Sequence, residues 1–252
     1  MDWLLSEDSF FKHCARIETF GWGDLVDWPE NTENPKLHHI RILKPEITPD
    51  QFKELCRIYK PLFESRKLTF SLKIPCSVSL APEIMSELQL TGTPLCYLVL
   101  ENGIQTSSVP SDAVELRQSK SLDDFYDWWL LYSTYPTREE KMKSPFMPYA
   151  RKAFESGTQF YVLYKAGEAV AGLALDKFLN SNGKEVYNLW GVATRDDQQR
   201  QGLYKILESK VLAPLASALY MQVLENSPLY NYYLVQRKTA RLLEVQARYV
   251  LR

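Results

Sequence analysis

The feature that most constrains the fold is the stretch from residue 185 to residue 211. The segment EVYNLWGVAT (185–194) predicts a strand, and seven of the next eight residues are polar. Gly202 follows, and then Leu203, Ile206, Leu207 and Val211 mark one face of a helix. A strand that passes through a polar, glycine-containing loop into a helix is typical of a chain that mixes sheet and helix.

The rest of the second half alternates in the same way. Ser121 and Asp124 have the spacing of a helix start, and Ala166-Gly167-Glu168 is a hairpin turn. The patterns predict a strand at 113–119, helices at 121–136 and 138–156, a hairpin at 158–178, a strand at 218–225, a helix at 227–236 and a strand at 241–251.

The first half has a similar order with weaker signals. We expect a strand at 37–43, a helix at 48–66 capped by Thr48, a strand at 67–75, a helix at 81–92 ended by Gly92 and a strand at 94–101. This order parallels that of 185–251. The polar stretch 101–113 reads as a linker, which predicts two domains, 1–105 and 113–252.

Composition excludes several classes of function. The formal net charge is −1, which favours neither nucleic-acid nor membrane-surface binding, and no apolar run has the length of a membrane helix. The N-terminus does not resemble a signal peptide. All four cysteines and all three histidines lie in the first 100 residues without a CxxC motif, so we expect no metal site and a cytoplasmic protein. Chemistry in the second half must therefore work without a thiol or an imidazole.

The polar loop after residue 194 has the properties of an anion site. A helix N-terminus presents unpaired backbone N–H groups and the positive end of the helix dipole. Gly202 lets the backbone approach an anion closely, and Gln199, Arg200 and Gln201 add side-chain donors. A pyrophosphate is the ligand that this arrangement predicts.

The stretch resembles the acetyl-CoA-binding segment of the GCN5-related N-acetyltransferases (GNAT), in which a strand leads into Arg/Gln-x-x-Gly-x-Gly/Ala and a helix. Asp196 replaces a common proline, and Tyr204 replaces the second glycine or alanine. The resemblance covers 113–252 and implies a mixed α/β (α+β) fold, a mostly antiparallel sheet flanked by helices, with a smaller, degenerate α/β domain before it. The cofactor-binding residues it implies are Val192, Ala193, Thr194, Gln199, Arg200, Gln201, Gly202, Leu203, Tyr204 and Asn226.

The same resemblance implies catalytic residues. Many members have an Asn at the end of the fifth strand and, seven residues later, a Tyr that protonates the leaving thiolate; Asn226 and Tyr233 have this spacing. Tyr230 and Tyr232 are rival proton donors. Glu185, Tyr187 or a chain of waters is the candidate for the general base.

These observations predict an N-acetyltransferase that moves an acetyl group from acetyl-CoA, as co-substrate, to an amine by direct attack in a ternary complex. The acceptor would be a small-molecule or peptide amine, and the sequence sets no oligomeric state. The alternative is a non-catalytic module that binds CoA or a protein. The aromatic residues of 125–132 either line the acceptor pocket or are packed in the core.

Overall fold

The computed structural model describes residues 1–31, 34, 37–101, 104 and 114–252. Most of the predicted linker at 101–113 lies outside the described residues. The chain divides into two compact units that interleave along the sequence. Unit 1 contains Met1–His13, Val99–Gln222 and Thr239–Arg241, and unit 2 contains Cys14–Leu98, Val223–Lys238 and Leu242–Arg252. Because each unit draws on both halves of the sequence, the two-domain boundary at 105–113 stays a prediction.

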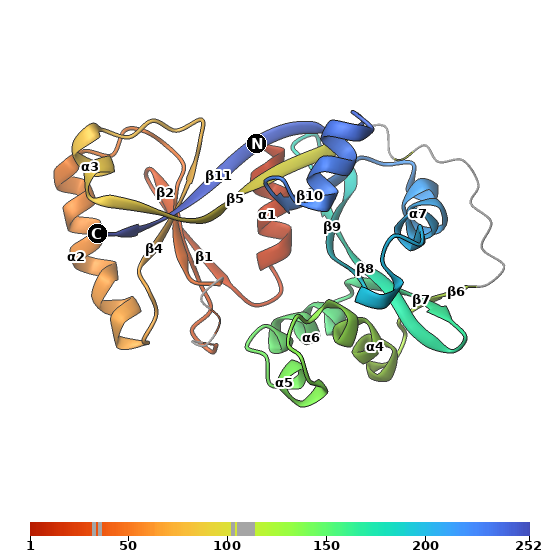
Figure 1. Ribbon diagram of the computed structural model, residues 1–252. Coiled ribbons are helices and arrows are strands. Elements are labelled where there is room, and N and C mark those ends of the chain that lie inside the picture. Colours follow the sequence, from red (N-terminus) through yellow and green to blue (C-terminus); the bar gives the residue numbers. More distant parts are fainter. Residues whose placement is uncertain (32–33, 35–36, 102–103, 105–113) are drawn as a thin grey trace. The chain divides into compact units, whose positions relative to one another are not determined.

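Unit 1 is built around antiparallel strands covered by helices. In chain order it holds α1 (Asp2–Phe11), β6 (Glu115–Gln118), α4 (Leu122–Tyr132), α5 (Arg138–Met142), α6 (Met147–Glu155), β7 (Gln159–Lys165), β8 (Glu168–Leu179), β9 (Glu185–Thr194), α7 (Leu203–Leu207), a π-helical continuation (Glu208–Leu212) and the start of β10 (Leu219–Leu224). Strands β6 to β9 pair antiparallel in sequence order, and β10 pairs parallel with β9. Figure 1 shows α4, α5 and α6 grouped on one side of β7 and β8, with α7 on the other.

Local sequence sets the boundaries of these helices. Ser121 accepts a hydrogen bond from the backbone N–H of Asp124, whose carboxylate accepts one from Ser121 in return, so the predicted start of α4 is confirmed. Pro145 and Pro148 fall in the predicted helix 138–156, which forms as two helices, α5 and α6, around this point. The hairpin turn forms at Ala166 and Gly167, both with positive φ.

The N-terminal helix α1, which the sequence pattern did not reveal, belongs to unit 1. The Ser6 hydroxyl donates to the Oδ1 of Asn188 in β9 at 3.1 Å, and the Tyr149 hydroxyl donates to the carbonyl of Phe10 at 2.5 Å. His13 contacts the buried Asp176 of β8 at 3.0 Å. The first residues of the chain therefore complete the packing of strands that come more than 150 residues later.

Unit 2 contains a second, smaller set of strands and helices. In chain order it holds β1 (Arg16–Phe20), β2 (Gly23–Asp27), β3 (His39–Ile42), α2 (Pro49–Ser65), β4 (Ser71–Pro75), α3 (Pro82–Ser86), most of β5 (Leu88–Leu100), α8 (Pro228–Tyr230), a π-helical segment (Asn231–Gln236) and most of β11 (Arg241–Leu251). β1, β2 and β3 pair antiparallel in turn, β4 pairs parallel with β3, and β11 pairs antiparallel with β4.

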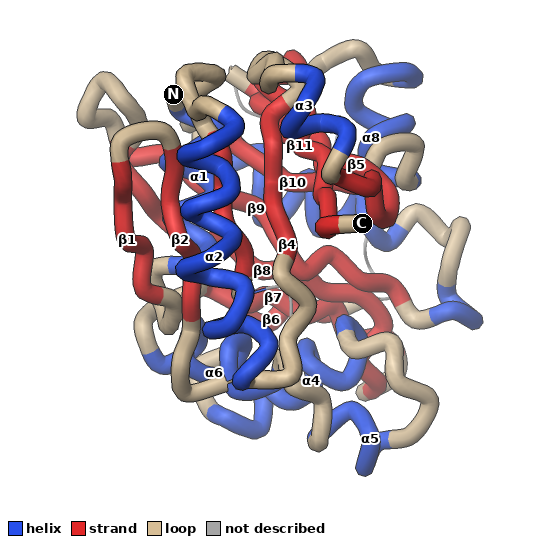
Figure 2. The backbone as a smooth tube through the Cα atoms, turned by 90° about the vertical axis from the view of Figure 1, so that its left-hand side faces the viewer, coloured by secondary structure: helices blue, strands red, loops and turns tan. Residues whose placement is uncertain are grey.

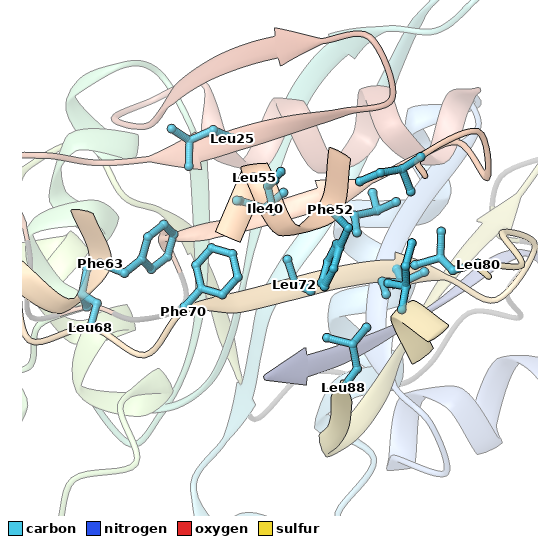
Figure 3. Packing of buried hydrophobic residues seen from close by; sticks show 14 residues of the cluster. Leu25, Ile40, Phe52, Leu55, Phe63, Leu68, Phe70, Leu72, Leu80 and Leu88 are labelled. Atoms are coloured by element: carbon cyan, nitrogen blue, oxygen red, sulfur yellow. The ribbon is translucent and has the colours of Figure 1, made fainter. Parts of the chain in front are cut away.

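The core of unit 2 lies between α2 and these strands, as Figures 2 and 3 show. Phe52, Leu55 and Phe63 of α2 belong to one buried cluster with Ile40 of β3 and Leu72 of β4. This burial of an amphipathic helix against a sheet supplies most of the stability that helix propensity alone does not.

Two predictions in this unit need correction. The helix predicted at 81–92 ends at Ser86, and Leu88–Gly92 belong to the strand β5. The hydroxyl of Thr91 donates to the carbonyl of Arg248 in β11, so a tertiary contact holds these residues in a strand. The strands β1 and β2 were not predicted.

Candidate active site

The strand β9 is interrupted by a bulge near its carboxyl end. The register between β8 and β9 shifts so that Ala174 faces Trp190 while Gly172 faces Ala193. Gly191, in the bulge, has a φ of +59°, which favours glycine. A bulge bends its strand and re-aims the backbone groups around it, so the pairing of β9 with β8 is interrupted at Gly191 and resumes at Ala193 and Thr194.

The side chain of Trp128, from α4, fills the space beside this bulge. Its indole N–H donates to the carbonyl of Gly191 at 3.1 Å, and the residue is completely buried. A Cβ at Gly191 would lie 2.3 Å from the Trp128 ring, and one at Gly172 would lie 2.9 Å from it. The indole therefore requires glycine at 191, and at 172 the indole and the carbonyl of Tyr161, also at 2.9 Å, both exclude a side chain. Of the two readings of the aromatic residues in 125–132, core packing is correct for Phe125, Trp128 and Trp129.

The pairing of β9 with β10 stops before the bulge. The parallel ladder joins Tyr187–Leu189 to Leu219–Met221, and β9 then continues to Thr194. Val192, Ala193 and Thr194 are half-buried. Their main-chain groups lie beyond the end of that ladder, at the place where the sequence predicts contact with the thioester.

The turn between β9 and α7 has two residues in the left-handed region. Arg200 has a φ of +64° and Gly202 a φ of +77°. Left-handed geometry costs a non-glycine residue roughly 1–2 kcal/mol, and strain of this kind gathers at functional sites. Gly202 is the N-cap of α7 and provides no side-chain cap. Within the described residues, the backbone N–H groups of Gln201, Gly202 and Leu203 have no hydrogen-bond acceptor.

The side chains of the turn are not equally available to a ligand. The Gln199 amide donates to Asp196 at 2.9 Å, and the Gln201 amide oxygen accepts from the Nζ of Lys165 at 2.9 Å. The Arg200 guanidinium is exposed and makes no ion pair with the described residues. Tyr204 is half-buried. Arg200 is thus the side-chain donor of the turn that a ligand can engage directly.

Lys165 is a residue of this turn that sequence reasoning missed. It ends β7, and its ammonium lies within reach of Gln198 and Gln201. Lys165 and Gln201 are 36 positions apart in the sequence, so only the pairing of β7, β8 and β9 brings this positive charge to the turn.

Asn226 and Tyr233 belong to unit 2. Asn226 has a φ of +61°, and its carbonyl accepts a hydrogen bond from the Asn231 side chain at 2.9 Å. Tyr233 is 0% exposed and packs edge-to-face on Tyr232, which is half-buried like Tyr230. Ser227 caps the helix that follows Asn226, and Pro228 begins it.

Glu185 is the first residue of β9. Its carboxylate is exposed and paired with Lys177 at 2.9 Å. Gly191 lies six positions further along the strand, which corresponds to roughly 20 Å of extended chain. This separation argues against Glu185 as a base for chemistry at the bulge, and its role stays a prediction.

A cavity of about 690 Å³ opens beside the end of β9. Its walls come from the second half of α4, the loop that follows it and the segment Val192–Asp196. Asp127, Ser133 and Tyr135 are among its lining residues. The cavity lies wholly within unit 1 and reaches Val192, Ala193 and Thr194, the three residues that follow the bulge.

The structure was also searched for metal sites and membrane spans. Among the described residues, no group of three or more His, Cys, Asp or Glu side chains could hold a metal ion. No helix in the described part of the chain has the length and apolarity to cross a membrane.

Comparison with known proteins gives structural but not sequence matches. No family model matches the sequence, and no curated protein matches it. A conserved protein of unknown function from Staphylococcus epidermidis is 12% identical, covers 94% of each chain and has a TM-score of 0.69. A GCN5-related N-acetyltransferase from Kribbella flavida is 13% identical over 100% of this chain and 95% of its own, with a TM-score of 0.67.

A third structure bears on the division into two units. A tandem GNAT protein from the clavulanic acid biosynthesis pathway is 10% identical over 94% of this chain and 82% of its own, with a TM-score of 0.56. Likenesses at this level of identity concern the fold. The predicted fold class is confirmed: the chain has the mixed α/β fold of the GCN5-related N-acetyltransferases.

Proposed function

We propose that the chain is an N-acetyltransferase that moves an acetyl group from acetyl-CoA to an amine. The observation that carries the proposal is the uncapped turn after a bulged strand, in which Gln201, Gly202 and Leu203 leave their N–H groups without acceptors among the described residues. The fold neighbours named as acetyltransferases support the same reading.

The residues of the turn fit a diphosphate. The N–H groups of Gln201, Gly202 and Leu203 can donate to its oxygens, and no atom lies within 4 Å of the place where a Cβ of Gly202 would stand, so the backbone is open to a ligand. Arg200 and Lys165 supply positive charge, and Gln199 and Tyr204 border the turn. Each hydrogen bond to a charged group contributes roughly 1.5–3 kcal/mol, so a few suffice for micromolar affinity.

The carboxyl end of β9 fits the pantetheine arm and the thioester of acetyl-CoA. Main-chain groups of Val192, Ala193 and Thr194 lie beyond the β10 ladder and can pair with the pantetheine amides and polarise the thioester carbonyl. Acetyl-CoA would supply the activated acyl group. The neutral amine attacks the carbonyl carbon through its lone pair, the carbon–sulfur bond breaks, the amine gives up one proton, and the thiolate gains one.

For the proton to the thiolate we propose Tyr233, with Asn226 as a co-substrate contact. A tyrosine that donates this proton should matter for turnover and not for affinity. Tyr233→Phe is therefore expected to lower kcat by tenfold or more while the Kd of acetyl-CoA changes little. An unchanged kcat would assign the proton to Tyr232, Tyr230 or water, and the matched variants Tyr232→Phe and Tyr230→Phe distinguish these.

The alternative is a module that binds CoA without catalysis. The complete burial of Tyr233 is the observation on its side. Two measurements separate the possibilities: calorimetric titration with acetyl-CoA, then thiol release over a panel of primary amines. Binding with thiol release supports the enzyme, binding without release supports the module, and no binding at millimolar acetyl-CoA defeats both.

A further inference from the structure

The cavity beside β9 contains polar groups that the proposed co-substrate site does not use. Its lining includes two carboxylates, Asp127 and Asp196, and two cations, Lys141 and Arg195. The cations already have partners. The ammonium of Lys141 donates to the carbonyl of Leu130, and Arg195 pairs with both Glu168 and Asp197 at 2.6 Å. The charge of Arg195 is therefore balanced, whereas Lys141 keeps its charge, so the lining holds the two carboxylates against one uncompensated cation.

Only one carboxylate oxygen of Asp127 accepts a hydrogen bond from the described residues. The Tyr164 hydroxyl donates to its Oδ2 at 2.7 Å, and no described residue donates to its Oδ1. Burial and this contact with Asp127 raise the pKa of Tyr164, so the phenol stays protonated and keeps donating. The half-buried carboxylate is thus fixed in orientation with one acceptor atom to spare.

A second polar group lies nearby without a partner. Ser133 is 8% exposed and lines the same cavity, and its hydroxyl makes no hydrogen bond with the described residues. A buried hydroxyl without a partner costs roughly 1–3 kcal/mol. A ligand donor would relieve this cost. The spare oxygen of Asp127 can only accept, and the Ser133 hydroxyl can accept or donate, so the two groups together favour a ligand that donates hydrogen bonds.

The remaining walls select the body of that ligand. They carry the apolar side chains of Leu130, Leu131, Pro136 and Val192 and the ring of Tyr135. A volume of about 690 Å³ is within the range of small-molecule pockets, roughly 300–1,000 Å³. The chemistry matches a molecule with a cationic amine at one end and an apolar or aromatic body.

We infer that this cavity binds the acceptor as a primary ammonium with an apolar body, and that Asp127, oriented by Tyr164, is the residue that selects the amine. The inference rests on the proposed function, because the bound amine is an acceptor only if the thioester lies at Val192–Thr194, which the cavity reaches. Asp127 lies on α4 immediately before Trp128, the residue that fills the bulge, so the binding residue is held on a rigid element. Figure 1 shows the place of α4 beside β7 and β8.

The test uses 2-phenylethylamine as the probe and 2-phenylethanol as its neutral counterpart, with binding followed by NMR titration of the whole chain. The amine is expected to bind at least tenfold more tightly than the alcohol. Equal affinities would overturn the inference, and this comparison needs no variant.

Variants locate the selectivity. Asp127→Asn keeps the shape and removes the charge, and it is expected to weaken amine binding tenfold or more without changing the affinity for the alcohol. Asp123→Asn is the matched control, because Asp123 is an exposed acid on the same helix and does not line the cavity. If Asp127→Asn binds the amine like the unchanged chain, Asp127 is not the selecting residue.

The acetyl-CoA titration runs in parallel so that the two proposals fail separately. Selective amine binding without acetyl-CoA binding would defeat the proposed function and leave an amine-binding cavity. Acetyl-CoA binding without selectivity for the amine would leave the proposed function and defeat this inference.

Discussion

The turns at 195–202 in unit 1 and 43–48 in unit 2 both connect a strand to a helix in the same local topology. They differ in how many backbone N–H groups at the helix start lack a hydrogen-bond acceptor among the described residues. In unit 1, β9 pairs antiparallel with β8, passes through 195–202 into α7, and pairs parallel with β10. In unit 2, β3 pairs antiparallel with β2, passes through 43–48 into α2, and pairs parallel with β4. The strand connections are alike, so the differences come from the residues.

The turn of unit 2 satisfies its own helix. Thr48 accepts from the Gln51 backbone, the Gln51 side chain accepts from the Thr48 backbone, and Pro49 removes one N–H at the first helical position. The turn of unit 1 does none of this, since its cap is Gly202. The turn of unit 1 thus leaves three N–H groups open to the proposed diphosphate, whereas the capping box and Pro49 leave fewer in unit 2.

The strands before the two turns differ as well. The β2–β3 ladder runs in regular register from Gly23↔Ile42 to Val26↔His39. The β8–β9 ladder breaks at Gly191. Topology alone therefore provides a scaffold, and the open turn and the bulged strand are the features that we propose equip unit 1 for a ligand. We propose on this basis that unit 2 is a degenerate counterpart without a co-substrate.

The largest expected effect on co-substrate affinity is that of Gly202→Asp. A carboxylate against the diphosphate replaces attraction with repulsion, and a loss of about 2 kcal/mol or more corresponds to a roughly thirtyfold weaker Kd for acetyl-CoA. Calorimetric titration measures it.

The control for that variant is Gly202→Asn, which has the same size, tolerates left-handed backbone and carries no charge. It is expected to lose much less affinity. In unit 2, Thr48→Asp keeps a capping side chain and should leave the Kd unchanged. If Gly202→Asp binds as tightly as the unchanged chain, the anion site lies elsewhere.

Gly191→Ala tests the bulge. The added Cβ meets Trp128 at 2.3 Å and stands at positive φ, so overpacking of roughly 1–3 kcal/mol adds to backbone strain of about 1 kcal/mol. Thermal and urea unfolding should show the loss of stability. Gly183→Ala is the control, because Gly183 has a φ of +71° but nothing within 4 Å of its Cβ position. Equal losses of unfolding free energy in the two variants would mean that the Trp128 side chain moves aside without destabilising the fold.

Thr48→Ala is expected to have the smallest effect. Loss of the cap should lower the free energy of unfolding by about 1 kcal/mol, measured by urea denaturation. The Kd of acetyl-CoA should stay the same, because the turn of unit 2 is proposed to serve only its helix. A parallel fall in affinity would place a ligand contact in unit 2 and erase the contrast between the turns.

Local sequence patterns predicted the helices whose first turn is fixed by contacts between residues close in the chain. The predicted caps at Thr48 and Ser121 are confirmed, since each is a contact between residues three apart in the chain. The helix α1 escaped prediction because its cap, Met1, makes no side-chain bond and its packing partners, such as Asn188, lie far along the chain. Leu88–Gly92 were assigned to a helix because their pairing with β11 is not visible in the sequence.

For the candidate site, the sequence by itself determined the turn: a polar loop, Gly202 and a helix are neighbours in the chain, and their chemistry is local. Only the tertiary structure decided the rest. Trp128 reaches Gly191 across 63 residues, Lys165 reaches Gln201 across 36, and Asp127 receives its hydrogen bond from Tyr164 across 37. The physical reason is that backbone geometry and capping act within one turn of chain, whereas cavities and oriented charges are made by strands and helices that meet only when the sheet forms.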